Sequence, residues 1–244
     1  MSDGGEATYQ SLIDEALFRP VRSGNAFEDT VARLLQTVRL GIVAPGEALP
    51  AERELAARFS VSRDTVRDAI RELSAAGYLV SKRGRYGGTF VSETLPVSTP
   101  ESPVTPTAAE IDDVLGLREV LELGATRAAA RRSLAANERD ALWTRLKETA
   151  LSSGDDYRRL DSRLHLAIAE ASGTPSLVSL VADARSRLND LLDRIPLLPP
   201  NIAHSNVQHE AIVVAILRGD EDKAAIAMQE HLDGSAALLR GFLA

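Results

Sequence analysis

The chain has 244 residues and a formal net charge of −7, so it is long enough for two domains that each bury a core. It contains no cysteine, which excludes disulfides and thiolate metal sites and is consistent with a reducing cytoplasm. No run of about 18 apolar residues is present, which argues against a membrane partner. The acidic N-terminus lacks the pattern of a secretion signal, so we expect a cytoplasmic protein.

The first region with a helix pattern follows a segment that offers little to a core. We predict that residues 1–24 form a mobile arm with one short helix, because glycines and a proline bracket its few apolar residues. A longer helix is predicted from Phe27 to Leu40, where apolar residues recur at helical spacing. Gly41 can end it in a left-handed cap.

Residues 49–73 have the pattern of two short helices joined by a turn. We predict the first from Ala51 to Arg58 and the second directly after Ser62, whose side chain can cap it. The second helix has one apolar face, with arginines at its outer start. This arrangement favours a helix-turn-helix over an ordinary helical hairpin with a solvated basic face. The apolar face comprises Val66, Ala69, Ile70 and Leu73.

Two short strands are predicted next, from Tyr78 to Lys82 and from Thr89 to Ser92. The residues between them, 83–88, are rich in glycine and positive charge, which is typical of a wing that approaches a phosphate or a minor groove. Residues 20–92 hold 11 Lys and Arg against 8 Asp and Glu, whereas residues 93–244 hold 16 against 23. We therefore expect DNA contacts in the first region, with the acidic second region facing away from DNA.

The sequence from about Phe27 to Ser92 resembles the winged helix of the GntR superfamily. The resemblance implies a homodimer that reads an inverted repeat in double-stranded operator DNA. Asp64 either accepts a hydrogen bond from a cytosine or orients Arg67. Residues that carry the resemblance are Gly41, Pro45, Gly46, Leu49, Pro50, Glu52, Arg53, Leu55, Ala56, Val61, Ser62, Arg63, Val66, Arg67, Leu73, Gly77 and Gly87 to Val91. The resemblance and the positive wing together imply DNA contacts from Arg53, Ser62, Arg63, Thr65, Arg67, Arg85 and Gly88.

The remainder of the chain has a linker pattern followed by helix patterns alone. Residues 93–106 are rich in proline, serine and threonine and are predicted to be the linker between two domains, 25–92 and 107–244. The fold class is thus mostly α: a winged helix-turn-helix of three helices and a small β-hairpin, then an antiparallel bundle of about six helices. We predict these six from Thr107, with a capping box, to Arg132, from Asn137 to Leu151, from Asp155 to Ala171, from Pro175 to Ile195, from Ser205 to Arg218 and from Glu221 to Leu243.

Three of the chain's four histidines lie on predicted helices near their apolar sides. Asp161 and His165 share one helix face, and His209 and His231 lie on the last two helices; His204 is predicted to lie in a loop and is left out. Three imidazoles and a carboxylate that converge would bind a divalent ion. The alternative is separate histidines that are hydrogen-bonded or exposed.

The segments 161–173 and 209–232 resemble the ligand-binding FCD domain of the FadR subfamily. The resemblance implies that Asp161, His165, His209 and His231 hold a divalent metal ion, zinc first, with nickel or manganese as alternatives. It also implies a small carboxylate effector bound through the metal, with Arg118 as its contact. A structural ion pair between Arg118 and Glu122 is the alternative for this arginine.

These resemblances favour a metabolite-responsive regulator of transcription that is not an enzyme, and relief of repression by a carboxylate is the expected response. One alternative is a metal-dependent enzyme, for which Glu170 or Asp183 would have to serve as general base. A second alternative is an architectural DNA-binding protein, which would need no buried metal cluster.

Overall fold

The computed structural model describes residues 17–18, 26–84, 87–96, 105–152 and 154–243. The chain is mostly α-helical and forms two compact units. Most of the predicted N-terminal arm, and residues 97–104 of the predicted linker, lie outside the described residues. In the part of the chain that the structure describes, no helix is long and apolar enough to cross a membrane.

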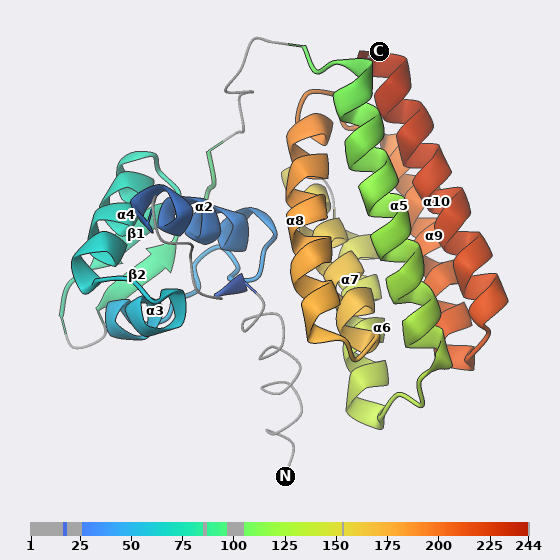
Figure 1. Cartoon of the computed structure of the whole chain (residues 1–244), viewed down its shortest axis with the longest axis horizontal. Helices are drawn as coiled ribbons and strands as arrows, with labels where there is room; N and C mark the ends of the chain where they lie inside the picture. Colours follow the sequence, from blue (N-terminus) through green and yellow to red (C-terminus); the bar gives the residue numbers. More distant parts are fainter. Residues whose placement is uncertain (1–16, 19–25, 85–86, 97–104, 153, 244) are drawn as a thin grey trace. The chain divides into compact units, whose positions relative to one another are not determined.

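The first unit combines three described helices with a β-hairpin (Figure 1). The predicted apolar face of the third helix is buried, where it packs with Leu34 and Val38 of the first helix and Phe59 of the second. The predicted winged helix-turn-helix architecture is therefore confirmed. The elements are α2 (Ala26–Arg39), α3 (Glu52–Phe59), α4 (Arg63–Ala75), β1 (Leu79–Lys82) and β2 (Gly88–Val91).

The turn between α3 and α4 depends on two serines. Ser60 has a φ of 57°, the left-handed conformation that ends α3. Ser62 caps α4, because its hydroxyl oxygen accepts a hydrogen bond of 3.0 Å from the backbone N–H of Thr65. Together they fix the direction in which α4 begins and place Arg63 in its first turn.

The hairpin is antiparallel, with Leu79 opposite Val91 and Lys82 opposite Gly88. A Cβ added at Gly87 would lie 2.5 Å from the carbonyl oxygen of Lys82, so the hairpin can close only with glycine at this position. The tip residues 85–86 lie outside the described residues.

In residues 105–152 and 154–243 the structure contains six α-helices, as predicted for the second unit (Figure 1). Helices α5 and α10 lie side by side and run in opposite directions, and α9 packs against α10. The predicted capping box is present, since Thr107 and Glu110 each accept the other's backbone N–H. The helices are α5 (Ala108–Arg131), α6 (Ala136–Leu151), α7 (Tyr157–Ala171), α8 (Pro175–Leu192), α9 (Pro199–Arg218) and α10 (Glu221–Leu243).

Two helix starts differ from the prediction. Helix α9 begins at Pro199 rather than Ser205, because proline is tolerated in the first helical turn, where its missing N–H is not needed. His204 therefore lies in a helix, and its predicted place in a loop is wrong. Helix α6 begins at Ala136 rather than Asn137, and at its start the Glu138 carboxylate accepts the N–H of Ala135 at 2.8 Å.

The bundle has two apolar clusters with a charged layer between them. One cluster includes Ala129 of α5 and Leu232 of α10, and the other includes Ile111 of α5 and Leu239 of α10. Along α5, buried Arg118 and Glu122 lie between these residues, and on α10 buried His231 lies next to Leu232. The members of this charged layer are Arg118, Glu122, Asp161, His165, Arg185, His209 and His231.

Candidate metal centre and nucleic-acid interface

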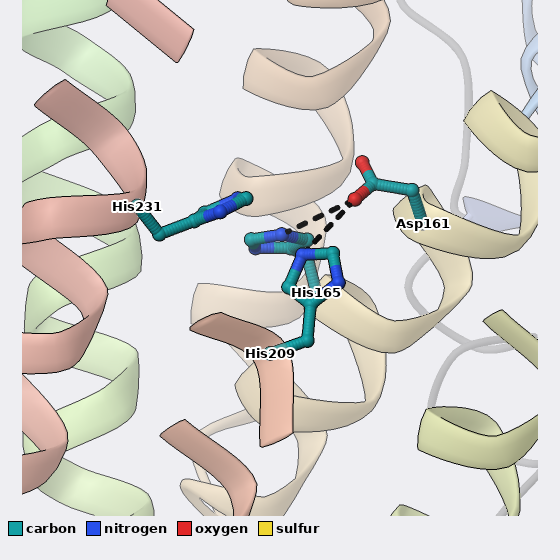
Figure 2. Close-up of side chains that lie close together, drawn as sticks. All are labelled: Asp161, His165, His209 and His231. Carbon is teal, nitrogen blue, oxygen red and sulfur yellow. Dashed lines mark ion pairs between the residues drawn. The ribbon is translucent and has the colours of Figure 1, made fainter. Parts of the chain in front are cut away.

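Four side chains from three helices meet in the charged layer. Asp161 and His165 lie one turn apart on α7, whereas His209 comes from α9 and His231 from α10. Figure 2 shows all four pointing toward one another. Each offers one potential ligand atom, and these atoms all lie within 4.8 Å of one another. The structure thus brings together the four residues that the sequence singled out.

The cluster has the dimensions and the unsatisfied atoms of a cation site. Ligands on opposite sides of an ion with bonds of about 2.1 Å are about 4.2 Å apart, so small movements would close the four around one ion. Nδ1 of His209 and Nε2 of His165 are buried without a hydrogen-bond partner among the described residues. Unsatisfied buried polar atoms are costly, and an ion would satisfy them. The residues present therefore fit a divalent metal.

The local electrostatics favour the protonation states that a metal requires. Burial, together with the neighbouring imidazoles and Arg118, lowers the pKa of His231 well below its ordinary value. Burial also lowers the pKa of His165, against the opposing effect of Glu122. For Asp161 burial alone would raise the pKa, but Arg185 and the neighbouring histidines hold it well below its usual range. Neutral imidazoles and an ionised carboxylate can coordinate without first losing protons.

Glu122 connects the candidate ligands to Arg118. Its Oε2 lies 2.7 Å from Nδ1 of His165, and its Oε1 lies 3.2 Å from Nε of Arg118. A carboxylate on the far nitrogen of a metal-binding histidine orients the ring and raises its basicity. Glu122 is 2 % exposed, and Arg118 and His165 hold its pKa well below the ordinary value although burial alone would raise it. Glu122 is therefore an ionised carboxylate that contacts both the Arg118 guanidinium and the candidate ligand His165.

Arg185 on α8 is a second buried cation beside the cluster. It is fully buried and pairs with Oδ2 of Asp161, while its Nη1 lies 3.7 Å from Oε1 of Glu122. The other oxygen of Asp161, Oδ1, lies 3.2 Å from Nε2 of His209. Asp161 thus presents one oxygen to Arg185 and the other to the imidazoles. Figure 2 shows the side that faces His165 and His209.

A cavity of about 240 Å³ borders the charged layer. Arg118, Asp161, Arg185 and His231 line one end of it, and side chains of α7, α8, α9, α10 and the α8–α9 loop form the rest of its wall. His204, on α9, is also a lining residue. We call this space the bundle cavity.

The structure confirms one sequence interpretation of Arg118, the ion pair with Glu122, while its predicted contact with an effector stays a prediction. Arg118 also lines the bundle cavity, with Nη1 donating to Ser235 at 2.6 Å. Sequence reasoning missed Arg185 altogether. The available signal was its position, since it continues the buried apolar stripe of α8 formed by Val178, Ala182 and Leu188. A cation in such a stripe indicates a buried anionic partner.

The predicted DNA-contacting residues of the helix-turn-helix lie at the surface of α3 and at the start of α4. Arg53, Ser62, Arg63 and Arg67 are exposed, and Thr65 is half-buried with its hydroxyl 2.8 Å from that of Ser62. In the described part of the chain, Arg53 and Arg63 have no ion-pair partner, so both guanidinium groups are available to DNA.

Arg67 differs from these two arginines because acidic neighbours hold its guanidinium. It pairs with Asp64 at 3.1 Å and with Glu52 at 3.4 Å. Two roles were predicted for Asp64, and this contact corresponds to the one in which its carboxylate orients the Arg67 guanidinium. Gly88 lies at the start of β2 in the wing, while Arg85 lies outside the described residues.

The chain combines a winged helix-turn-helix with an all-helical bundle that contains a buried polar cluster and a cavity. This combination defines the class of two-module regulators of transcription. Residues 27–91 match the family described as bacterial regulatory proteins, gntR family, and residues 113–234 match the FCD domain. The chain belongs to the GntR family and carries an FCD domain. It is a regulator of transcription and not an enzyme.

Named relatives agree with this assignment. The putative L-lactate dehydrogenase operon regulatory protein of Escherichia coli (strain K12) is 32% identical over 224 residues, covering 87% of this chain and 84% of the relative. The HTH-type transcriptional repressor NanR of Salmonella arizonae is 31% identical over 239 residues, covering 92% and 88%. The solved structure of E. coli McbR/YncC has a TM-score of 0.55 at 19% identity and covers 88% of this chain and 97% of its own, which supports the fold.

Proposed function

We propose that this chain is a metabolite-responsive regulator of the FadR subfamily, in which a small carboxylate bound at a metal ion alters operator affinity. The observation that carries the proposal is the convergence of four buried potential ligands within 4.8 Å, beside a cavity that Arg118 also lines. A regulator of operator DNA acts in the cytoplasm, and we place the protein there.

Asp161, His165, His209 and His231 would hold the ion. Three imidazoles and one carboxylate suit zinc first, with nickel or manganese as alternatives. A bound ion would supply the positive charge that attracts a carboxylate oxygen. Glu122 and Arg185 would fix the orientation of His165 and Asp161 through the contacts described above.

Arg118 would bind the effector's carboxylate beside the ion. Its Nε donates to Glu122, its Nη1 donates to Ser235, and its Nη2 lies 3.4 Å from Nε2 of His231, which orients the guanidinium and leaves one N–H on each Nη for a ligand. Arginine suits this role because its planar fork matches a carboxylate. The pair with Glu122 therefore supports effector binding, because it holds the arginine in place.

On the DNA side, a homodimer would place two copies of α4 on an inverted repeat. One winged helix alone buries little surface, so two are needed for useful affinity and specificity. Arg53, Arg63 and Arg67 would contact DNA from α3 and α4, with Arg85 and Gly88 at the wing. Effector contacts that favour one spacing of the two winged helices over another would change operator affinity, most simply by relieving repression.

The test compares two histidines on the same helix. His209→Ala removes a candidate ligand, and His204→Ala, an exposed histidine of α9, is the matched control. Operator DNA is first selected from a random pool by the wild-type protein. We then measure metal content by atomic absorption, and operator affinity with and without each of a panel of carboxylates of two to ten carbons.

We expect His209→Ala to bind little metal and to lose the carboxylate response, while His204→Ala, which lies outside the ligand cluster, retains its metal. A full response in a protein without detectable metal would refute the metal-dependent part of the proposal. An architectural DNA-binding protein would show no effector response in the wild type.

A further inference from the structure

The bundle cavity has a charged end and an apolar end. On α10 the lining residues run from His231 through Gly234 to Leu238, and on α8 they run from Arg185 to Leu192. On each helix the first of these lining residues belongs to the charged layer, and the last, which follows seven positions later, is a leucine. Seven residues of helix rise by about 10.5 Å. The cavity therefore extends about that far from the charged layer.

The apolar end is part of the second apolar cluster of the bundle. Leu188 and Ile195 are buried members of that cluster, and Leu192 and Leu238 pack against it. Pro196, Leu197, Leu198 and Ile202 extend this wall.

One cation, Arg158, lines this end of the cavity, and its guanidinium is already in use. Nη1 pairs with Asp193 at 3.0 Å, and Nη2 donates to the carbonyl of Ile195 at 2.7 Å. The apolar end therefore offers contact area for hydrocarbon, with Asn201 and Ser205 of α9 as polar side chains beside it, and the one arginine among its described lining residues is already paired.

We propose that the effector is an amphipathic monocarboxylate, with its carboxylate at the charged layer and an apolar tail against the leucine wall. This inference rests on the proposed function, because the metal and Arg118 bind the carboxylate. A volume of about 240 Å³ corresponds to roughly eight water-sized groups, so the tail has about that many non-hydrogen atoms. A second carboxylate on the tail would lose water at the leucine wall without gaining an unpaired arginine or lysine among the described lining residues.

The first arm of the test measures chain length. The metal-loaded full-length protein is titrated by calorimetry with acetate, butyrate, hexanoate and octanoate, and with octanedioate, in which a second carboxylate replaces the terminal methyl group of octanoate. Burying one methylene is worth about a fourfold gain in affinity. We expect affinity to rise at each step to octanoate, and octanedioate to bind at least about tenfold more weakly than octanoate.

The second arm fills the cavity midway. Gly234 lines the cavity between the charged and apolar ends of α10, and a Cβ added there meets no described atom within 4 Å. In Gly234→Leu the leucine side chain should enter the cavity. The variant should bind octanoate about tenfold or more weakly and butyrate with unchanged affinity. Gly241→Leu is the matched control, because Gly241 lies on the same helix with equal room and does not line the cavity. Replacing glycine by leucine favours the helix in both variants, and circular dichroism checks their folding.

The outcomes separate this inference from the proposed function. The inference is supported if affinity rises with chain length in the wild type and in Gly241→Leu, and stops rising at a shorter chain in Gly234→Leu. Butyrate or octanedioate binding as tightly as octanoate, or equal behaviour of the two glycine variants, would overturn it and leave a carboxylate effector intact. If no carboxylate binds the metal-loaded protein, this inference and the carboxylate part of the proposed function both fail.

Discussion

Replacing Arg185 by methionine should cost more stability than any other single change of charge in the bundle. The side chain is fully buried, pairs with Asp161, and lies 3.7 Å from Glu122. At an effective dielectric constant of about 20, an ion pair at this distance is worth roughly 4 kcal/mol. Removing one partner of a buried pair typically costs about 3–5 kcal/mol, and we expect Arg185→Met to lower the free energy of unfolding by that amount in metal-free protein.

A bound ion should reduce this cost. The ion would take over part of the charge of Asp161, so the metal-loaded variant should lose less stability than the metal-free variant. The assay is urea denaturation of both variants with zinc and with a chelator. The control is Arg187→Met on the same helix, whose exposed pair with Asp113 is worth less than about 1 kcal/mol. The reasoning is refuted if Arg185→Met is as mild as the control, or if its cost is the same with and without metal.

Three further predictions follow from the site, the recognition helix and the linker. Because the pKa values of His165 and His231 are lowered in the folded protein, the unfolded chain binds more protons as pH falls. The metal-free protein should therefore lose stability from about pH 6.5 downward, by up to about 1.4 kcal/mol per pH unit for each histidine, and a flat denaturation profile between pH 7.5 and 5.5 would contradict this. Arg63→Ala should lose about 1–3 kcal/mol of discrimination at one guanine per half-site, measured as the ratio of operator to scrambled-DNA affinity; an unchanged ratio would show the assignment to be wrong. Limited proteolysis should cut between Glu93 and Pro106 and release two folded pieces, whereas persistent full-length protein under conditions that trim the N-terminus would contradict an accessible linker.

The sequence was most informative where local rules determine the structure. Apolar periodicity located the buried face of α4, and the Thr107 capping box marked the start of α5. Local rules also explain why the start of α9 was predicted wrongly. Prolines usually separate helices, but here they occupy the first turn of α9. That misplaced start put His204 in a loop.

The site was only partly predictable, because its partners come from different helices. Asp161 and His165 share a helix face, so their convergence follows from a spacing of four residues. The contact between Arg185 and Asp161 joins α8 to α7, and no spacing rule reaches across helices. The two roles of Arg118 could not be separated either, since an arginine four residues before a glutamate fits an ion pair with or without a cavity beside it.

The position of Glu122 bears on how such a regulator could acquire a new effector. One carboxylate contacts both His165 and Arg118, so under the proposed function a substitution of Glu122 would disturb ion binding and anion binding together. Descendants that respond to a different compound are therefore easier to reach through Leu192, Ile202 or Leu238, which line the cavity away from this carboxylate. In a laboratory selection for altered inducers, we expect accepted mutations to concentrate at those positions while the charged layer stays unchanged.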